Sequence, residues 1–220
     1  MGKIFSWFCY LFLKPLVSLI WIKKVVGKEN VPKGNFILAA NHRSHWDQVM
    51  TAFVCVPRPF TYLGQIDKYV GFEGFLRDLL YKIAGVVPIH RYNPESKKKA
   101  LKECVKALQE GKILIMYPEG TRSRTNEFLP PKPGVAKLHF LSQKPILPVA
   151  IKGNFEVMPP GRVFPKFKKI VEINIGKPLE FKEEMERAKN LDCRSQEYLQ
   201  ICENVAQKVM EEIKRLYEQL

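Results

Sequence analysis

Residues 36–47 read Phe-Ile-Leu-Ala-Ala-Asn-His-Arg-Ser-His-Trp-Asp, and this stretch decides the fold class. Its first five residues form an uninterrupted apolar run, which predicts a short buried strand. Further apolar runs predict strands at 60–63, 86–89, 113–117 and 146–151. Helical patterns separate these runs, so the sequence predicts an α/β fold, a mixed β-sheet flanked by helices.

The helical patterns lie at 44–55, 72–83 and 94–110. A stripe of apolar residues at steps of three and four, from 198 to 216, predicts a long helix at the C-terminal end. Residues 170–175 alternate apolar and polar side chains, as a half-buried strand does. The length of 220 residues corresponds to about one and a half average domains, so we expect one compact domain with an appended segment.

The composition restricts the classes of function. Lys and Arg number 36 against 22 Asp and Glu, and the net charge of +14 favours nucleic acid, anionic lipid or phosphorylated small molecules. The sequence contains no helix-turn-helix, RNP or zinc-finger pattern, so we expect no nucleic-acid partner. The five cysteines include no C-x-x-C, which indicates a reducing compartment and no metal site. Motifs for NAD, ATP, a serine nucleophile and a zincin site are absent from the sequence, and we expect no cofactor.

The first 28 residues predict a membrane anchor. Residues 4–13 and 16–22 are apolar runs separated by Lys14-Pro15, and each is too short to span about 30 Å of hydrocarbon. We expect two short helices, broken near Pro15, that lie in the membrane interface. Residues 1–28 are then a two-helix membrane-docking motif, and residues 29–220 form the α/β domain. The alternative is a helix packed in the core of the main domain.

The densest group of reactive side chains follows the strand at 36–40. On one regular helix His42 and Asp47 would lie about 140° apart and could not meet. They meet if His42 lies in the loop and Asp47 in the first helical turn, where the carboxylate fixes the imidazole tautomer and the other nitrogen serves as a general base. Two alternatives are structural, because Ser44-x-x-Asp47 is a capping-box pattern and His42 could be a hydrogen-bonded structural residue. His45 is a rival base, although its close spacing to Asp47 is less suitable.

A second polar segment, Tyr-Pro-Glu-Gly-Thr-Arg-Ser at 117–123, follows the most apolar strand. Ligands of α/β sheets bind outside the carboxyl ends of the strands. Gly120 lets the backbone approach an anion, and Arg122 offers two parallel donors to a phosphate. The alternative is a polar turn in which Thr121 caps a helix.

Four segments together resemble one known family. The patterns N-H-x-x-x-x-D at 41–47 and P-E-G-T-R-S at 118–123 resemble motifs of the glycerolipid acyltransferases, whose bacterial type is the lysophosphatidate (1-acyl-sn-glycerol-3-phosphate) acyltransferase. Residues 85–91 and 147–151 are similar to two further blocks of that family, in the family's order. The resemblance covers roughly residues 30–175 and implies that 29–220 is an acyltransferase domain.

The resemblance implies an acyl transfer from an acyl-CoA or acyl-carrier-protein thioester to the sn-2 hydroxyl of 1-acyl-sn-glycerol 3-phosphate, giving phosphatidate. His42 is then the general base, and Asp47 orients it. The positions that match the family's acceptor-binding residues are Glu119, Gly120, Thr121 and Arg122. Lys68 is the nearest match for a further lysine, although its Asp-Lys-Tyr-Val context departs from the family pattern.

The resemblance also implies where the protein acts. We expect a peripheral or monotopic protein on the cytoplasmic face of the cell membrane, with an anionic lipid surface, the thioester donor and lysophosphatidate as its partners. A hydrophobic groove for the acyl chain could be lined by residues 72–83. Glycerol 3-phosphate or a lysophospholipid is the alternative acceptor. A non-catalytic membrane lipid-binding protein is the alternative outside the enzymes.

Overall fold

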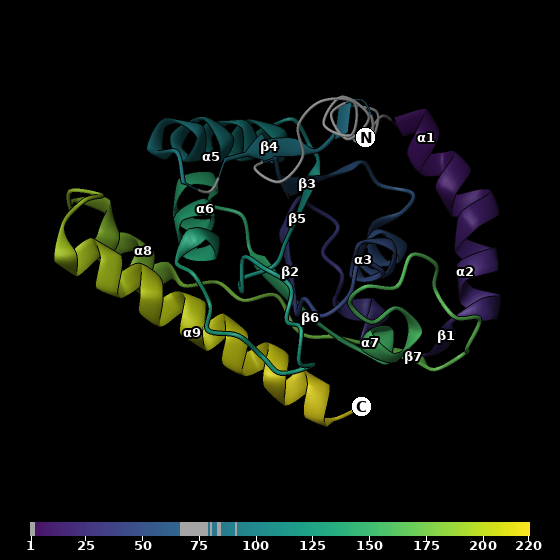
Figure 1. The fold of residues 1–220 in the computed structure, drawn as a ribbon. Coiled ribbons are helices and arrows are strands. Elements are labelled where there is room, and N and C mark those ends of the chain that lie inside the picture. Colours follow the sequence, from purple (N-terminus) through teal and green to yellow (C-terminus); the bar gives the residue numbers. More distant parts are fainter. Residues whose placement is uncertain (1–2, 67–78, 80, 83–84, 91) are drawn as a thin grey trace.

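A computed structural model describes residues 3–66, 79, 81–82, 85–90 and 92–220 (Figure 1). In this part of the chain the framework is a seven-stranded sheet with the order β1-β7-β6-β2-β5-β3-β4. The strands are β1 (Ile22–Val26), β2 (Ile37–Ala40), β3 (Phe60–Gln65), β4 (Val87–Ile89), β5 (Ile113–Met116), β6 (Ile146–Lys152) and β7 (Val171–Ile175). The predicted mixed sheet is confirmed, and the predicted strand boundaries are close to the observed ones.

Strand β2 lies at the centre of the sheet because it pairs along both edges. Leu38 is opposite Leu147 of β6 on one side and Ile115 of β5 on the other, and both pairings are parallel. The β6–β7 pair is antiparallel, whereas β1–β7, β3–β4 and β3–β5 are parallel. Parallel neighbours end at the same edge of a sheet, so the ends of β2 and β5 bring residues 41–47 and 117–123 together.

Helices cover both faces of this sheet (Figure 1). They are α3 (Asp47–Cys55), α5 (Pro94–Gln109), α6 (Gly134–Ser142), α7 (Asn154–Val157), α8 (Lys182–Lys189) and α9 (Gln196–Glu218). Leu38 and Ala40 belong to a buried cluster that includes side chains of α3. Ile37 and Ala39 belong to a second cluster with side chains of α5, α6 and α9. A strand covered on both faces is apolar throughout, which explains the unbroken run at 36–40.

The predicted helices have mixed outcomes. The long C-terminal helix is confirmed as α9, and its apolar stripe is buried. The helix predicted at 94–110 is confirmed as α5, whose N-terminus is capped by the side chain of Asn93. The helix predicted from residue 44 begins only at Asp47. The helix predicted at 72–83 falls almost entirely outside the described residues.

The strand predicted at 170–175 is confirmed as β7, but the prediction that it is half-buried is wrong. Every residue of β7 is buried, including the polar Glu172 and Asn174. The strand lies between β1 and β6 instead of at an edge, and α9 contacts it. Asn174 Nδ2 donates to the Leu216 carbonyl of α9 at 3.0 Å, and Glu172 lies 3.0 Å from Lys23 Nζ of β1. The alternating polar side chains therefore form a hydrogen bond and an ion pair with neighbouring elements of the protein.

The N-terminal segment is helical from residue 3 to residue 20. It consists of α1 (Lys3–Phe8), a π-helical turn η1 (Cys9–Leu13) and α2 (Lys14–Ile20) in direct succession. The predicted break near Pro15 is therefore wrong: Pro15 lies in the first turn of α2, and the Lys14 N–H bonds to the Cys9 carbonyl across the wider preceding turn. Proline lacks an N–H and crowds the carbonyl four residues earlier, and the wider turn accommodates this.

The helical segment is attached to the domain by one narrow side. Ser6, Val17 and the following Trp21 are buried. Most of its large apolar side chains are exposed: Ile4, Phe5, Trp7, Phe8, Leu11, Phe12, Leu13, Leu16 and Leu19. The alternative of a core helix does not fit this exposure. Residues 22–26, which the sequence assigned to the anchor, form β1 of the sheet. Among the helices of the described residues, none has both the length and the apolar character that crossing a membrane requires.

Candidate active site

The site begins at Asn41, where the chain leaves the sheet after β2. Asn41 is buried, and its side chain replaces a backbone pairing: Nδ2 donates to the Ile151 carbonyl at 2.9 Å, and Oδ1 accepts from the Ile151 N–H at 2.8 Å. These two hydrogen bonds to β6 fix the direction in which the chain turns away from the sheet. His42 follows immediately, so its position is set by the sheet.

His42 and Asp47 meet as the loop-to-helix geometry predicted. Nδ1 of His42 lies 3.0 Å from Oδ2 of Asp47, the first residue of α3. Because a carboxylate only accepts hydrogen bonds, Nδ1 carries the proton and donates it to Asp47. Proton transfer to or from a ligand then falls to Nε2.

Asp47 is fully buried and accepts four hydrogen bonds. Oδ2 accepts hydrogen bonds from the His42 imidazole and from the N–H groups of Arg43 and Ser44, the last two at 2.6 and 2.8 Å. Oδ1 accepts a hydrogen bond from Nδ2 of Asn154 at 2.8 Å. Bonds to a charged acceptor are stronger than neutral ones, so four of them offset the burial of the carboxylate. Asp47 is therefore held in one orientation.

Asp47 takes part in a capping-box turn and also contacts His42. The Ser44 N–H donates to Asp47, as in a capping box, but Ser44 Oγ accepts from the N–H of Trp46 at 3.0 Å. One carboxylate thus closes the turn before α3 and orients the histidine. His45 is exposed and does not line the cavity described below.

The segment after β5 holds His42 from the other side. The ring of Tyr117 stacks on the imidazole, with centroids 3.9 Å apart and planes 9° from parallel. The His42 N–H donates to Glu119 Oε1 at 2.7 Å, and the His42 carbonyl accepts from the N–H of Ser123 at 2.8 Å. These contacts join the two sequence segments, 41–47 and 117–123, into one site.

Glu119 is buried beneath the loop that follows it. Its second carboxylate oxygen accepts from the Leu129 N–H at 2.9 Å, so both oxygens are used by backbone groups. Burial raises the pKa of the Glu119 carboxyl, and the hydrogen bonds from Leu129 and His42 act in the opposite direction. The side chain ties the loop to the backbone of His42.

Gly120 adopts a left-handed conformation with φ of +67°, which favours glycine. A Cβ at this position would lie 2.9 Å from Cδ of Lys132, so the lysine side chain runs across the glycine. Thr121 is exposed and Arg122 partly exposed in the loop beyond it. The alternative in which Thr121 caps a helix is wrong, because the next helix is α6, which begins at Gly134.

Arg43 is a site residue that the sequence reasoning missed. Its guanidinium lies between the rings of Phe128 and Tyr217, 4.1 and 4.4 Å from their centroids. Nη1 donates to the Tyr217 hydroxyl at 2.9 Å and to Oδ1 of Asn126 at 3.0 Å. The residue after His42 therefore binds the loop at 118–133 and the last turns of α9 at the same time.

A largely apolar cavity of about 560 Å³ opens beside His42. Its wall includes His42, Tyr117 and Gly120, and apolar side chains extend it: Leu63, Ile89, Leu101, Cys104, Met116 and Leu138. Four basic residues also line it, Lys97 and Lys98 of α5, Lys137 of α6, and Lys132. A volume of this size suits a small-molecule ligand, and the combination suits one with an apolar chain and anionic groups. Lys68 and the groove wall predicted at 72–83 lie outside the described residues, except for Leu79, Tyr81 and Lys82.

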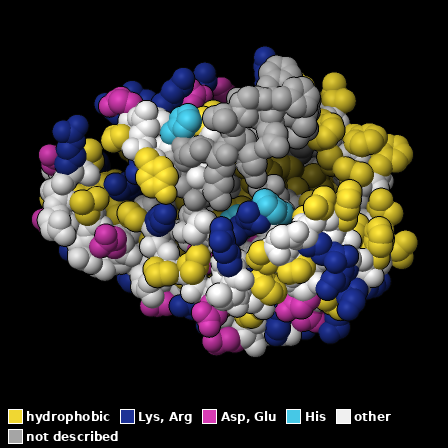
Figure 2. Space-filling view, in the orientation of Figure 1, with side chains coloured by type: hydrophobic (Ala, Val, Ile, Leu, Met, Phe, Trp, Pro, Cys, Tyr) yellow, Lys and Arg dark blue, Asp and Glu magenta, His cyan; other side chains and the backbone are white. Residues whose placement is uncertain are grey.

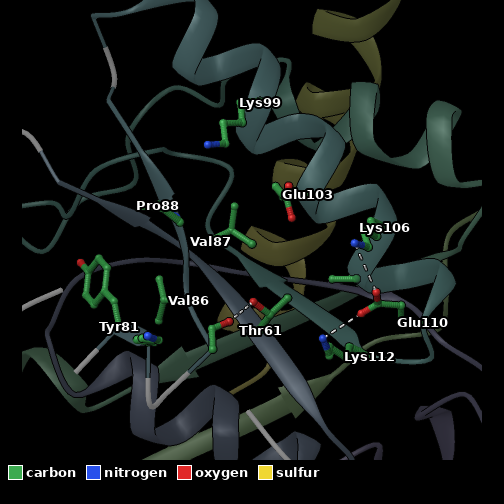
Figure 3. Close-up of a pocket in the computed structure, with 13 residues that line it drawn as sticks. Thr61, Tyr81, Val86, Val87, Pro88, Lys99, Glu103, Lys106, Glu110 and Lys112 are labelled. Carbon is green, nitrogen blue, oxygen red and sulfur yellow. Dashed lines mark hydrogen bonds and ion pairs between the residues drawn. The ribbon is translucent and has the colours of Figure 1, made fainter. Parts of the chain in front are cut away.

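A second cavity, of about 410 Å³, is lined by Thr61, Val87 and Lys112 among others (Figure 3), and His42 is not one of its lining residues. Thr61 and Lys112 place it at the amino ends of β3 and β5, whereas His42 lies beyond the carboxyl end of β2. Glu110 already pairs there with Lys112 at 3.0 Å and Lys106 at 3.9 Å. Of these two cavities, the first is the one that His42 lines. No group of three His, Cys, Asp or Glu side chains suited to a metal ion occurs in the part of the chain described.

Comparison with known proteins identifies the family. A model of the acyltransferase family matches residues 23–152, which include both site segments. The chain belongs to this family. Over 175 residues this acyltransferase-family chain is 32% identical to the 1-acyl-sn-glycerol-3-phosphate acyltransferase of Bacillus subtilis, covering 78% of this chain and 81% of that protein.

Further proteins similar to this acyltransferase-family chain are also named as acyltransferases. The 1-acyl-sn-glycerol-3-phosphate acyltransferase of Limnanthes douglasii is 35% identical over 154 residues, but the match spans only 53% of that protein's length and 64% of this chain. The crystal structure of the 1-acyl-sn-glycerophosphate acyltransferase PlsC from Thermotoga maritima is similar in fold. It has a TM-score of 0.69 and 25% identity, over 97% of this chain and 78% of that one.

Proposed function

We propose that the chain is a 1-acyl-sn-glycerol-3-phosphate O-acyltransferase that makes phosphatidate. The observation that carries this proposal is His42, which lies on the wall of an apolar cavity with lysines around it and has Nδ1 3.0 Å from the buried Asp47 carboxylate. Similarity to the named acyltransferases of Bacillus subtilis and Thermotoga maritima supports the choice of acceptor.

In the proposed reaction, Nε2 of His42 takes the proton of the sn-2 hydroxyl as the oxygen attacks the thioester carbonyl. The C–O bond forms, the tetrahedral intermediate collapses, and the C–S bond breaks. The protonated imidazole then returns its proton to the departing thiolate. Asp47 stabilises the imidazolium between these two transfers. The thioester is already activated, so the reaction requires no covalent intermediate with the enzyme.

The acceptor phosphate is assigned to the loop after β5. Gly120 brings backbone close to the cavity, and the basic side chains of Arg122 and Lys132 belong to the same loop, with Thr121 at its exposed turn. We assign Glu119 a positioning role, since both of its oxygens hold backbone N–H groups. Lys68 remains a proposed phosphate ligand from the sequence resemblance.

The donor is a thioester on CoA or on acyl carrier protein. Both carry the same phosphate-bearing pantetheine arm, and Lys97, Lys98 and Lys137 at the cavity suit an anionic arm. The apolar residues of the cavity are the proposed site of an acyl chain.

The helical segment at 3–20 is proposed to dock the enzyme on the membrane that holds its acceptor. Its outward side chains form an exposed apolar face, and such a face is typical of an interfacial helix. Lys23, Lys24 and Lys28 follow it and suit anionic lipid. With buried thiols at Cys55, Cys104 and Cys202, the reducing cytoplasmic face is the proposed location.

The test is acyl transfer to 1-oleoyl-lysophosphatidate by detergent-solubilised protein, with palmitoyl-CoA and palmitoyl carrier protein compared in parallel. His42→Ala is expected to lower kcat by about 10²–10⁴-fold, the contribution of a general base. His45→Ala is the matched control, because this neighbouring histidine is exposed outside the cavity, and its rate should stay at the wild-type level.

Two results would redirect the proposal. Product formed from glycerol 3-phosphate or from a lysophospholipid, but not from lysophosphatidate, would keep the reaction and change the acceptor. No turnover with any acceptor, together with vesicle binding that His42→Ala leaves unchanged, would favour the non-catalytic lipid-binding alternative. Near-full activity of His42→Ala would refute the general-base assignment.

A further inference from the structure

The segment between α7 and β7 exposes large apolar side chains to solvent. Val163, Phe164 and Phe167 are 76%, 75% and 79% exposed, values that only Ile4 and Tyr92 exceed among the exposed large hydrophobic residues of the described chain. Packing within the domain does not account for three such side chains within five residues. Exposed apolar clusters of this kind mark surfaces that contact a partner or a membrane.

Basic residues alternate with these apolar ones. Arg162, Lys166, Lys168 and Lys169 lie in the same segment, and residues 158–170 contain no Asp or Glu. We name residues 159–169 the aromatic–basic loop. Aromatic rings beside a cluster of cations suit the headgroup region of an anionic bilayer, where rings enter the interface and cations meet lipid phosphates.

The aromatic–basic loop is fastened to the end of the N-terminal helical segment. Trp21 Nε1 donates to the Lys166 carbonyl at 2.8 Å, and the Trp21 ring stacks on Phe167 with centroids 5.8 Å apart. The Val171 N–H donates to the Trp21 carbonyl at 2.8 Å, and the Lys166 N–H bonds to the Val157 carbonyl at 2.8 Å. The backbone of the loop is thus fixed, although its side chains face solvent.

The loop and the helical segment lie on the same side of the molecule. The loop passes the lower end of α2 beside β1 (Figure 1). On that side Figure 2 shows hydrophobic side chains gathered over α1 and α2, with Lys and Arg side chains next to them. Trp21 also contacts Trp46, 4.9 Å between centroids, immediately before Asp47. The loop is therefore connected through one buried tryptophan to both the helical segment and the site.

We propose that the aromatic–basic loop is a second membrane-contact element, which inserts Val163, Phe164 and Phe167 into the interface of an anionic bilayer. The proposal rests on the proposed docking of residues 3–20. A single interfacial helix can roll about its own axis, and that roll would carry the site toward or away from the lipid surface. A second contact, fixed to the helix end by Trp21, prevents the roll and holds the His42 cavity in one orientation to the membrane.

The test is binding of the full chain to phosphatidylcholine vesicles with and without phosphatidylglycerol. Phe164→Ala with Phe167→Ala is expected to weaken binding to both vesicle types, about tenfold for each ring removed from the interface. Leu141→Ala is the matched control: Leu141 is an exposed apolar residue on α6, on the opposite side of the view from α2, and binding should not change.

The basic side chains have a separate expected effect. Lys168→Gln with Lys169→Gln should weaken binding to the phosphatidylglycerol vesicles by about fivefold per charge and leave binding to pure phosphatidylcholine unchanged. Added salt should reduce the difference between wild type and this variant. Acyl transfer by both loop variants in detergent micelles should remain at the wild-type level, because micelles impose no orientation.

Three results would overturn the proposal. If the double Phe variant binds vesicles like wild type while Phe5→Ala with Phe12→Ala does not, the helical segment docks alone and the proposed function stands. If the basic variant loses binding to acyl carrier protein instead of to vesicles, the loop is a protein-docking surface. If the loop variants lose activity in micelles as well, the loop supports the catalytic domain and not its orientation. Loss of vesicle binding by the loop variants with activity intact in micelles is the supporting result.

Discussion

Asp47→Asn changes one atom of a side chain and removes a buried negative charge that four donors share. In the protein, Oδ2 accepts from the His42 imidazole and from the N–H groups of Arg43 and Ser44, while Oδ1 accepts from Asn154. An amide has one accepting atom. If that oxygen keeps the three donors on the Oδ2 side, the new NH₂ group faces Nδ2 of Asn154. If the amide rotates, the NH₂ group faces two backbone N–H groups and the imidazole.

The expected loss follows from these contacts. Hydrogen bonds to a charged group contribute about 1.5–3 kcal/mol and neutral ones about 0.5–1.5 kcal/mol, so three retained but neutral bonds cost about 3 kcal/mol of the free energy of unfolding. In a chain of this size that corresponds to a fall of about 6–12 °C in Tm. Without the carboxylate the imidazolium is not stabilised and the tautomer is not fixed, so kcat should fall by about 10³–10⁴-fold.

Two measurements separate these effects. Thermal unfolding followed by circular dichroism gives the stability, and initial rates of acyl transfer at a temperature where the variant is folded give kcat. Asn154→Ala is the companion variant, because it removes a donor from Oδ1 and leaves the His42–Oδ2 contact. It should lower stability by about 1–3 kcal/mol and kcat by less than about tenfold. A folded Asp47→Asn protein with a kcat within about tenfold of wild type would refute the reasoning.

Two further predictions concern other buried side chains. Burial lowers the pKa of His139, whose Nδ1–H donates to the Lys144 carbonyl while Nε2 accepts from the Phe181 N–H. Its contribution to stability is therefore present above the unfolded pKa of about 6.5 and is lost as the pH falls through the folded pKa, with a slope of at most about 1.4 kcal/mol per pH unit. Urea unfolding between neutral pH and mildly acidic pH measures this slope, and His139→Gln should flatten it; an equal slope in both proteins would contradict the assignment. Arg43→Lys should lower the free energy of unfolding by about 1–3 kcal/mol and reduce kcat, because an ammonium cannot stack between two rings and donate to the Tyr217 hydroxyl as a guanidinium does. Thermal unfolding and initial rates check it, and an unchanged Tm would exclude the stacking argument.

Local sequence patterns predicted the structural features that depend on residues close together in the chain. The apolar run at 36–40 and the five-residue spacing of His42 and Asp47 depend on geometry within one turn of chain, and both expectations are confirmed. No strand order was predicted from the sequence, so the meeting of segments 41–47 and 117–123 became visible only in the structure, where β2 and β5 pair in parallel. The long helix α9 followed from its apolar stripe.

Contacts between distant residues could not be predicted in this way. The alternation at 170–175 indicated a solvent face, but the polar residues have partners in β1 and α9, which no local pattern reveals. Asn154 supports Asp47 from 107 residues away, and nothing in its own neighbourhood marks it. Charged residues in Ile-Lys-Lys-Val-Val at 22–26 concealed β1, because at the edge of the sheet its lysines stay exposed.

The contact between Arg43 and Tyr217 has a consequence for the order of events during synthesis. These residues are separated by 174 positions, so the support next to His42 is missing until the end of α9 has been translated. At about 5–20 residues per second, that interval is about 10–35 s. The sheet strands around His42 emerge well before then. The nascent chain therefore carries residues 41–47 without the partner that secures Arg43 until Tyr217 has been added.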